Sequence, residues 1–241
     1  MNKLIDINTI VFDADDTLWA NETRFREAEK QAAAALSAYC DLNTRSSALY
    51  STEVKNMEDY GFGAKAFVLS MLETAVSISN GKVSGKEIQK ILEAGRWLLH
   101  NPAKPLEGVE ETLMRFKNEG RYRLAVLTKG DLLDQERKLE RSGLLKYFDY
   151  IEITSDKSAK EYSTLCKKLG INIKNMAMVG NSFKSDIAPV LESGGFGIHI
   201  PFEVIWELEK MEEYEHPKLF KLKEFKDLES LFFANSTVNK E

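Results

Sequence analysis

The stretch Ile7-Asn8-Thr9-Ile10-Val11-Phe12-Asp13-Ala14-Asp15-Asp16-Thr17 decides how the rest of the chain is interpreted. Its first half is a short run of apolar and β-branched residues, which is typical of a buried strand. The run ends abruptly at a group of aspartates, so the strand is expected to pass directly into a polar loop. Ligands of open parallel sheets lie beyond the carboxyl ends of the strands, and this loop is therefore a candidate functional site.

The chain that follows is helical in pattern as far as residue 100. Strong helix formers fill its first part, and no convincing strand interrupts it. The predicted helices lie near residues 22–39, 46–60, 65–78 and 84–99. Asn101-Pro102-Ala103-Lys104-Pro105 then marks a boundary, because it contains two of the five prolines. We therefore predict an inserted all-helical domain over residues 21–100.

Beyond the prolines, helices alternate with strands. The predicted helices cover residues 109–118, 132–141, 159–169 and 185–192, and the predicted strands cover residues 122–127, 150–154, 176–179 and 196–200. Such alternation favours an α/β fold with a Rossmann-like, three-layer core around a parallel sheet, formed by residues 1–20 and 101–241. Residues 196–200 are predicted to be the last strand, and residues 218–223 are expected to form an amphipathic surface segment.

Polar side chains follow four of the predicted strands at the point where each strand ends. Because these ends meet at one edge of a parallel sheet, their carboxylates, hydroxyl and ammonium groups are expected to converge. The residues concerned are Asp13 and Asp15 after the first strand, Thr128 after the second, Lys157 after the third, and Asn181 and Asp186 after the fourth.

These residues resemble the four motifs of the haloacid dehalogenase superfamily, in the same order. Asp13-Ala14-Asp15-Asp16-Thr17 resembles the first motif, and Gly180-Asn181-Ser182-Phe183-Lys184-Ser185-Asp186 resembles the acidic fourth. Thr128 resembles the second motif and Lys157 the third. The first and fourth motifs are specific as a pair, whereas the second and third are weak alone. The resemblance covers the sheet domain, and residues 21–100 are similar to the helical cap domain of the family's phosphatases.

The resemblance implies a magnesium-dependent phosphatase that acts on a small phosphomonoester. Asp13 would be the nucleophile that forms a phospho-aspartate, and Asp15 would be the general acid and base. Asp13, Asp186 and the backbone carbonyl of Asp15 would hold Mg²⁺. Thr128 and Lys157 would hold the phosphoryl oxygens and offset their charge.

Three assignments leave room for alternatives. Lys160 competes with Lys157 as the phosphate-binding lysine, and we favour Lys157 because it lies nearer the strand end. Asn181 stands where the family more often has aspartate, so it is expected to support the metal site, as is Thr17. In the helical domain, the glycine-flanked turn around Phe62 and Lys65 is expected either to contact the leaving group or simply to connect two helices.

Composition excludes some partners. Hydrophobic residues make up 43% of the chain and the formal net charge is -5, so a general attraction for nucleic acid is not expected. The start of the chain is too polar for a secretory signal, and no apolar run is long enough to span a membrane. We therefore expect a cytoplasmic protein, monomeric or homodimeric, whose partner is a small phosphorylated metabolite.

Other functions use the same motifs. A dehalogenase needs no metal and no leaving-group acid, so Asp15 argues against it. A sugar phosphate mutase would use the same core, and a non-catalytic phospho-ligand binding protein would keep only the fold. The sequence does not select the phosphorylated substrate.

Overall fold

The first strand forms the centre of the sheet because every one of its residues is apolar or small enough to be buried on both sides. All four residues of β1 (Thr9–Phe12) are buried in the computed structural model, which describes residues 4–233. Strands buried on both faces are typical of parallel sheets. The sheet continues on both sides of β1 in the order β3-β2-β1-β4-β5-β6, with every neighbouring pair parallel. The other strands are β2 (Arg123–Lys129), β3 (Tyr150–Thr154), β4 (Met176–Gly180), β5 (Phe196–His199) and β6 (Leu219–Lys221).

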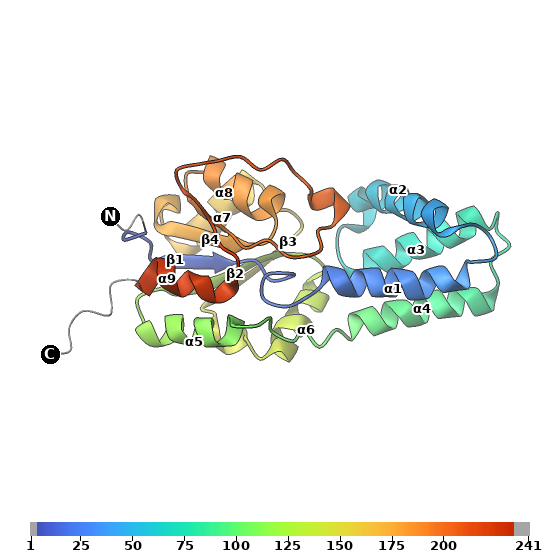
Figure 1. The fold of residues 1–241 in the computed structure, drawn as a ribbon, viewed down its shortest axis with the longest axis horizontal. Helices are drawn as coiled ribbons and strands as arrows, with labels where there is room; N and C mark the ends of the chain where they lie inside the picture. Colours follow the sequence, from blue (N-terminus) through green and yellow to red (C-terminus); the bar gives the residue numbers. More distant parts are fainter. Residues whose placement is uncertain (1–3, 234–241) are drawn as a thin grey trace.

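Helices cover both faces of this sheet (Figure 1). Successive side chains of a strand point to opposite faces, so Ile10 and Phe12 pack on one side and Val11 on the other. The first face is covered by α5 (Val109–Glu119), α6 (Leu132–Ser142) and α9 (Leu228–Phe233), and the second by α7 (Ala159–Leu169) and α8 (Ala188–Glu192). The predicted three-layer α/β class is confirmed.

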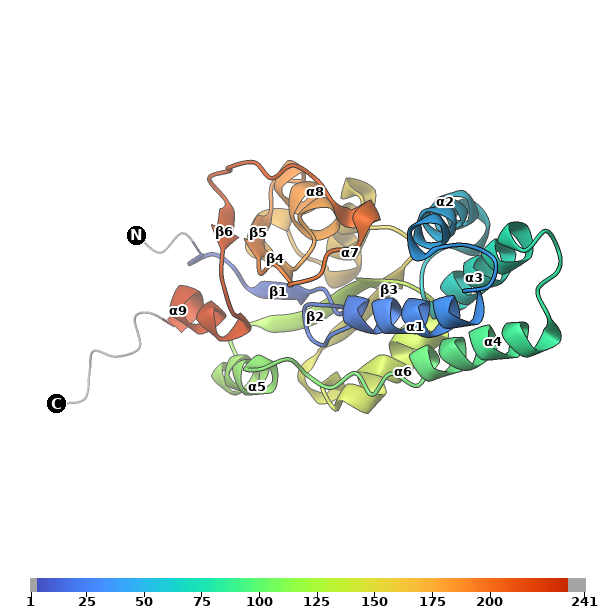
Figure 2. The ribbon, with the colours of Figure 1, turned by 45° about the vertical axis from the view of Figure 1, so that its right-hand side comes forward.

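The helical unit, defined here as α1 to α4, lies beyond the carboxyl end of β1 (Figure 2). It comprises α1 (Glu22–Ala35), α2 (Leu42–Tyr60), α3 (Ala64–Ile78) and α4 (Gly85–Leu99). Helix α1 packs against α4, and α3 packs against α2 and α4, around an apolar cluster of its own. We propose that this unit is the inserted domain predicted over residues 21–100.

Two adjacent segments connect the helical unit to the sheet. Trp19 pairs with Pro105 as an isolated antiparallel bridge, and the Leu106 N–H donates to the Leu18 carbonyl at 2.9 Å. The outgoing and returning chains therefore run side by side. Asp16 has a φ of 61°, a left-handed conformation that lets the chain turn back toward Trp19 immediately after β1.

One prediction about the end of the chain was wrong. Residues 196–200 are not the last strand, because β6 follows and pairs with β5 at the sheet edge. The segment 218–223 was expected to be an amphipathic surface segment; its centre forms this edge strand, in which Leu219 and Phe220 are half-buried and Lys221 is exposed. The run Lys218-Leu219-Phe220-Lys221-Leu222-Lys223 shows no regular alternation and so gives no clear strand pattern, and the pairing depends on the edge that β5 offers.

Helix boundaries also differ from the prediction. Helix α1 ends at Ala35, before the expected residue 39, and α2 begins at Leu42 because the Asp41 side chain accepts from the Thr44 N–H at 3.0 Å. Among residues 4–233, no helix combines the length and the apolar character needed to cross a bilayer. Residues 1–3 and 234–241, assigned to the core from the sequence, lie outside the described range.

Candidate active site

The register of the sheet places Asp13 at the junction of three strand ends. Phe12 lies opposite Val126 of β2 and Val179 of β4, so the next residue emerges between these two strands. The Asp13 N–H donates to the Val179 carbonyl at 2.9 Å, which continues the ladder for one more step. Asp13 therefore lies where the carboxyl ends of β1, β2 and β4 meet.

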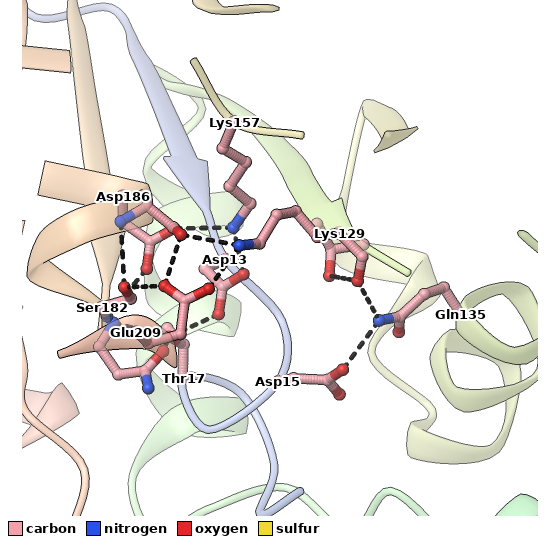
Figure 3. Close-up of polar contacts among 12 residues, drawn as sticks. Asp13, Asp15, Thr17, Lys129, Gln135, Lys157, Ser182, Asp186 and Glu209 are labelled. Carbon is pink, nitrogen blue, oxygen red and sulfur yellow. Dashed lines mark hydrogen bonds and ion pairs between the residues drawn. The ribbon is translucent and has the colours of Figure 1, made fainter. Parts of the chain in front are cut away.

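Lys157 lies between two buried carboxylates, Asp13 and Asp186 (Figure 3). Its ammonium group contacts Asp13 and lies 2.7 Å from an Asp186 oxygen. The three residues are 3%, 6% and 1% exposed, respectively. Lys160, the competing lysine, is exposed and does not line the cavity that residues 4–233 form.

Burial raises the pKa of Asp13 to about 7, Lys157 opposes the rise, and Asp186 adds to it. Burial alone would lower the pKa of Lys157, but the two carboxylates outweigh this effect and raise it. The single ammonium of Lys157 therefore neutralises only one of the two carboxylate charges of Asp13 and Asp186, and these three residues together carry a net negative charge.

The loop after β4 presents Asp186 through a close approach to the backbone. A Cβ atom built on Gly180 would lie 2.2 Å from an Asp186 carboxylate oxygen, so the carboxylate occupies the space that a side chain would fill. The Ser182 N–H donates to Asp186 at 3.0 Å. A π-helical turn, Phe183–Ile187, carries Asp186 ahead of α8 and replaces the start of the helix expected at residue 185.

Thr17 connects Asp13 to the same loop. Its hydroxyl lies 3.0 Å from an Asp13 oxygen and 3.2 Å from the Asn181 amide oxygen, and it accepts from the Asn181 N–H at 3.1 Å. Thr17 therefore fixes the distance between the loop after β1 and the loop after β4. Thr128 is buried at the end of β2 and lines the cavity.

Asp15 is turned away from Asp13 and held by three donors (Figure 3). The Lys138 ammonium contacts its two oxygens at 3.0 and 3.1 Å, the Gln135 amide donates at 2.8 Å, and the Trp19 indole donates at 2.8 Å. The sequence analysis missed Lys138 and Gln135. The sequence contains no direct signal for them, because the burial of Gln135 and Lys138, three residues apart on one face of α6, is visible only in the structure.

A cavity of about 180 Å³ lies between these residues and the helical unit. Phe62 lines it and contacts Trp206 edge-to-face, with ring centroids 6.0 Å apart. Lys65 does not line it; its ammonium pairs with Asp131 at 2.9 Å and connects the helical unit to the start of α6. The structure thus brings Phe62 to the site and places Lys65 outside the cavity.

Acidic residues outnumber basic ones around the cavity by eight to four. The acidic residues are Asp13, Asp15, Asp16, Glu22, Glu29, Glu53, Asp186 and Glu209, and the basic ones are Arg26, Lys129, Lys138 and Lys157. Each of these four cations already contacts at least one carboxylate. Burial raises the pKa of Asp16 to about 8 and those of Glu22 and Glu53 to about 7. An anion entering the cavity therefore meets no uncommitted cation among the described lining residues.

The donor set fits magnesium. Asp13 and Asp186 supply carboxylate oxygens, and Asn181 adds an amide oxygen nearby, linked to Asp13 through Thr17. Within residues 4–233, no group of three or more His, Cys, Asp or Glu side chains gathers as a complete metal cage. Mg²⁺ commonly uses one or two carboxylates and completes its shell with water and substrate oxygens, so a third carboxylate is not required. The shortage of positive charge between Asp13 and Asp186 also favours a divalent cation.

Comparisons with known proteins identify the family of this chain. Residues 7–194 match the family model described as "Hydrolase: haloacid dehalogenase-like hydrolase". The crystal structure of a haloacid dehalogenase-like family hydrolase from Xanthomonas campestris superposes with a TM-score of 0.83 at 33% identity, over 94% of this chain and 92% of that one.

Two relatives carry the name glyceraldehyde 3-phosphate phosphatase. The protein of Methanothermobacter thermautotrophicus is 24% identical over 82% of this chain and 87% of its own length. The protein of Methanopyrus kandleri is 22% identical over 80% of this chain and 84% of its own length. Together with the family match over most of the sheet domain and the helical unit, these relationships assign the chain to the haloacid dehalogenase-like hydrolase family.

Proposed function

We propose that this hydrolase is a magnesium-dependent phosphatase that cleaves a small phosphomonoester through a phospho-aspartate at Asp13. The observation that carries the proposal is the buried contact of Lys157 with both Asp13 and Asp186 at the floor of the cavity. A carboxylate nucleophile can approach a phosphate only where positive charge offsets their repulsion. The cavity has room for on the order of ten water molecules, which suits a small metabolite.

Asp13 performs the first step. One of its oxygens forms a bond to phosphorus as the ester bond to the leaving oxygen breaks, and the phosphoryl group passes to Asp13. Asp15 gives a proton to the leaving oxygen and then takes one from the water that attacks phosphorus. The attack releases inorganic phosphate and restores the Asp13 carboxylate. Thr128 and Lys157 hold the phosphoryl oxygens through both steps.

Asp15 must move for this chemistry. Its contacts with Lys138, Gln135 and Trp19 hold it turned away from Asp13, so it has to leave at least some of these donors to reach the leaving oxygen. We therefore expect the retracted position to belong to the free enzyme.

Asp13, Asp186 and the backbone carbonyl of Asp15 would hold Mg²⁺, with Thr17 and Asn181 fixing the loops that carry them. The bound ion would supply the positive charge that the cavity lacks and polarise the phosphoryl group. The raised pKa of Asp13 supports this need, since Asp13 must be deprotonated to attack.

The helical unit would act as the cap that excludes water. Phe62 is positioned to contact the leaving group, because it lines the cavity from the turn between α2 and α3. Lys65 is better suited to holding the cap against α6 through Asp131.

Phosphate release from p-nitrophenyl phosphate and glyceraldehyde 3-phosphate tests the proposal. The second substrate enters because two relatives are named for it. We expect turnover with Mg²⁺, loss of turnover with EDTA, and loss in Asp13→Asn, whereas the exposed control Asp156→Asn stays within twofold of the unmodified protein. Lys157→Met should abolish turnover and Lys160→Met should not.

Other outcomes identify the competing functions. Chelator-resistant halide release from a haloacid would indicate a dehalogenase, and rearrangement of a sugar phosphate without phosphate release would indicate a mutase. Ligand binding without turnover across a wide panel of phosphate esters would indicate a binding protein.

A further inference from the structure

The segment between β5 and β6 closes one side of the cavity, although none of the four motifs includes it. Residues Val204, Ile205, Trp206 and Glu209 line the cavity from this segment. It has little regular structure apart from the short 3₁₀ turn Glu207–Glu209. Trp206 contacts Phe62 of the helical unit, so the segment lies between the sheet domain and that unit.

The Glu209 carboxylate is surrounded by hydrogen-bond donors of the kind that bind an anion (Figure 3). Its carboxylate accepts from the Lys129 ammonium, the Ser182 hydroxyl and the Ser185 hydroxyl, each at 2.5 Å. Lys129 also contacts Ser185 at 2.8 Å. An ammonium and two hydroxyls around one carboxylate make charge-assisted hydrogen bonds, the stronger class. Burial would raise the pKa of Glu209, but Lys129 and the two hydroxyls outweigh it and lower the pKa to about 2.

The three donors come from the loops that flank Asp13. Lys129 directly follows Thr128, and Ser182 and Ser185 precede Asp186. All three donors and Glu209 line the cavity, and the Lys129 and Glu209 side chains each remain 16% exposed. Lys129 also lies 4.6 Å from the centre of the Phe62 ring, below the helical unit. The donors thus lie beside the proposed phosphate site, where the leaving group of a bound ester would be.

Glu209 can leave these donors without disturbing the sheet. It belongs to a three-residue turn, and the strands on either side of its segment are held by their own ladder. A carboxylate on a substrate would make the same contacts that Glu209 makes. The protein's own side chain therefore marks both the position and the chemistry of the group that replaces it.

We propose that Lys129, Ser182 and Ser185 form a subsite for a carboxylate on the leaving group of the substrate, and that Glu209 fills this subsite in the free enzyme. The inference rests on the proposed phosphatase function and narrows its substrate class to phosphomonoesters that also carry a carboxylate. Glu209 competes with the substrate for the subsite, so its removal should strengthen binding of such esters alone.

Two probes separate this effect from a general one. 3-Phosphoglycerate and glycerol 3-phosphate have the same carbon skeleton and phosphate, and only the first has a carboxylate. If Glu209 fills the subsite nine-tenths of the time, its removal should tighten 3-phosphoglycerate binding about tenfold. We expect Glu209→Ala to lower KM for 3-phosphoglycerate by about this factor and to leave KM for glycerol 3-phosphate within twofold. Lys129→Met should weaken the binding of 3-phosphoglycerate more than that of glycerol 3-phosphate.

Binding calorimetry in the Asp13→Asn background gives the same comparison without turnover, so a failure of the proposed chemistry does not affect it. Glu209→Gln, which keeps the shape and removes the charge, replaces Glu209→Ala if that variant misfolds. Equal changes for both esters, weaker 3-phosphoglycerate binding without Glu209, or binding of neither ester would each overturn the subsite. Absence of phosphate release with selective binding intact would overturn only the phosphatase proposal.

Discussion

Among the described residues, three lysines line the cavity, and one of them, Lys157, contacts Asp13. Of the other two, Lys129 and Lys138, we expect the loss of Lys138 to lower the stability of the fold more. Its side chain is 4% exposed and contacts Asp15 at 3.0 Å, the Asn21 amide oxygen at 2.9 Å and Asp134 at 3.6 Å. Lys138→Met keeps the length of the side chain and removes the charge. Asp134, whose side chain is also 4% exposed, then remains buried without its cation.

Breaking a buried pair by removing one partner costs about 3–5 kcal/mol. For a protein of this size that corresponds to a Tm decrease of roughly 6–20 °C. Burial already raises the pKa of Asp134, and Lys138 opposes the rise, so its removal raises the pKa further. A carboxyl whose pKa is higher in the folded state than in the unfolded state destabilises the fold as pH rises, and a proton relieves the cost at low pH. The loss should therefore be larger at pH 8 than at pH 5.

Urea unfolding followed by circular dichroism measures this loss at both pH values. Lys146→Met is the matched control, because Lys146 pairs with Glu110 at 3.0 Å while 62% of its side chain is exposed. A solvent-exposed pair of this kind contributes little to stability because water screens the two charges. If Lys138→Met costs no more than the control, or costs the same at pH 5 and pH 8, Lys138 does not stabilise the fold by neutralising Asp134.

Two further predictions concern burial and backbone approach. Burial raises the pKa of Glu22 from 4.5 to about 7, so its charge destabilises the fold increasingly between these pH values. Glu22→Gln should therefore stabilise the protein by about 1–3 kcal/mol at pH 8.5 and hardly at pH 4.5. A stabilisation that does not change with pH in thermal unfolding would contradict the raised pKa of Glu22. Gly180→Ala should lower kcat/KM by about a hundredfold, because the new Cβ would lie 2.2 Å from the Asp186 carboxylate. In the control Gly85→Ala the new Cβ would meet nothing within 4 Å, and kcat/KM should stay unchanged. Similar kcat/KM in the two variants would show that Asp186 tolerates displacement.

The sheet and the strand-end cluster could be predicted because they depend on local signals. Residues 7–12 form a continuous apolar run, and Asp13, Lys157 and Asp186 each follow a strand or begin a helix at an expected place. Parallel pairing then brings them together without further information. The preference for Lys157 over Lys160 followed from position along the chain and agrees with where the two side chains lie, one buried against Asp13 and the other exposed.

The remaining parts of the site depend on contacts between segments far apart in the sequence. Glu209 lies in an irregular segment, where no periodicity indicates which side chain turns inward. Lys138 reaches Asp15 across 123 residues of sequence. The turn around Phe62 and Lys65 was expected either to contact the leaving group or to connect two helices, and the sequence does not show that Asp131 pairs with Lys65 outside the cavity. Tertiary pairing of this kind leaves no mark in a single sequence.

The paired crossing of the chain at Trp19 and Pro105 restricts how the helical unit can swing. The two connecting segments are hydrogen-bonded to each other, so we expect them to resist twisting of the helical unit and to allow its rotation about the line that joins them. Trp19 belongs to one of these segments, and its indole N–H also donates to an Asp15 carboxylate oxygen at 2.8 Å. We therefore expect that any rotation of the helical unit about this crossing would also shift Asp15, the residue proposed to transfer the proton, because Trp19 belongs to the crossing and holds the Asp15 side chain.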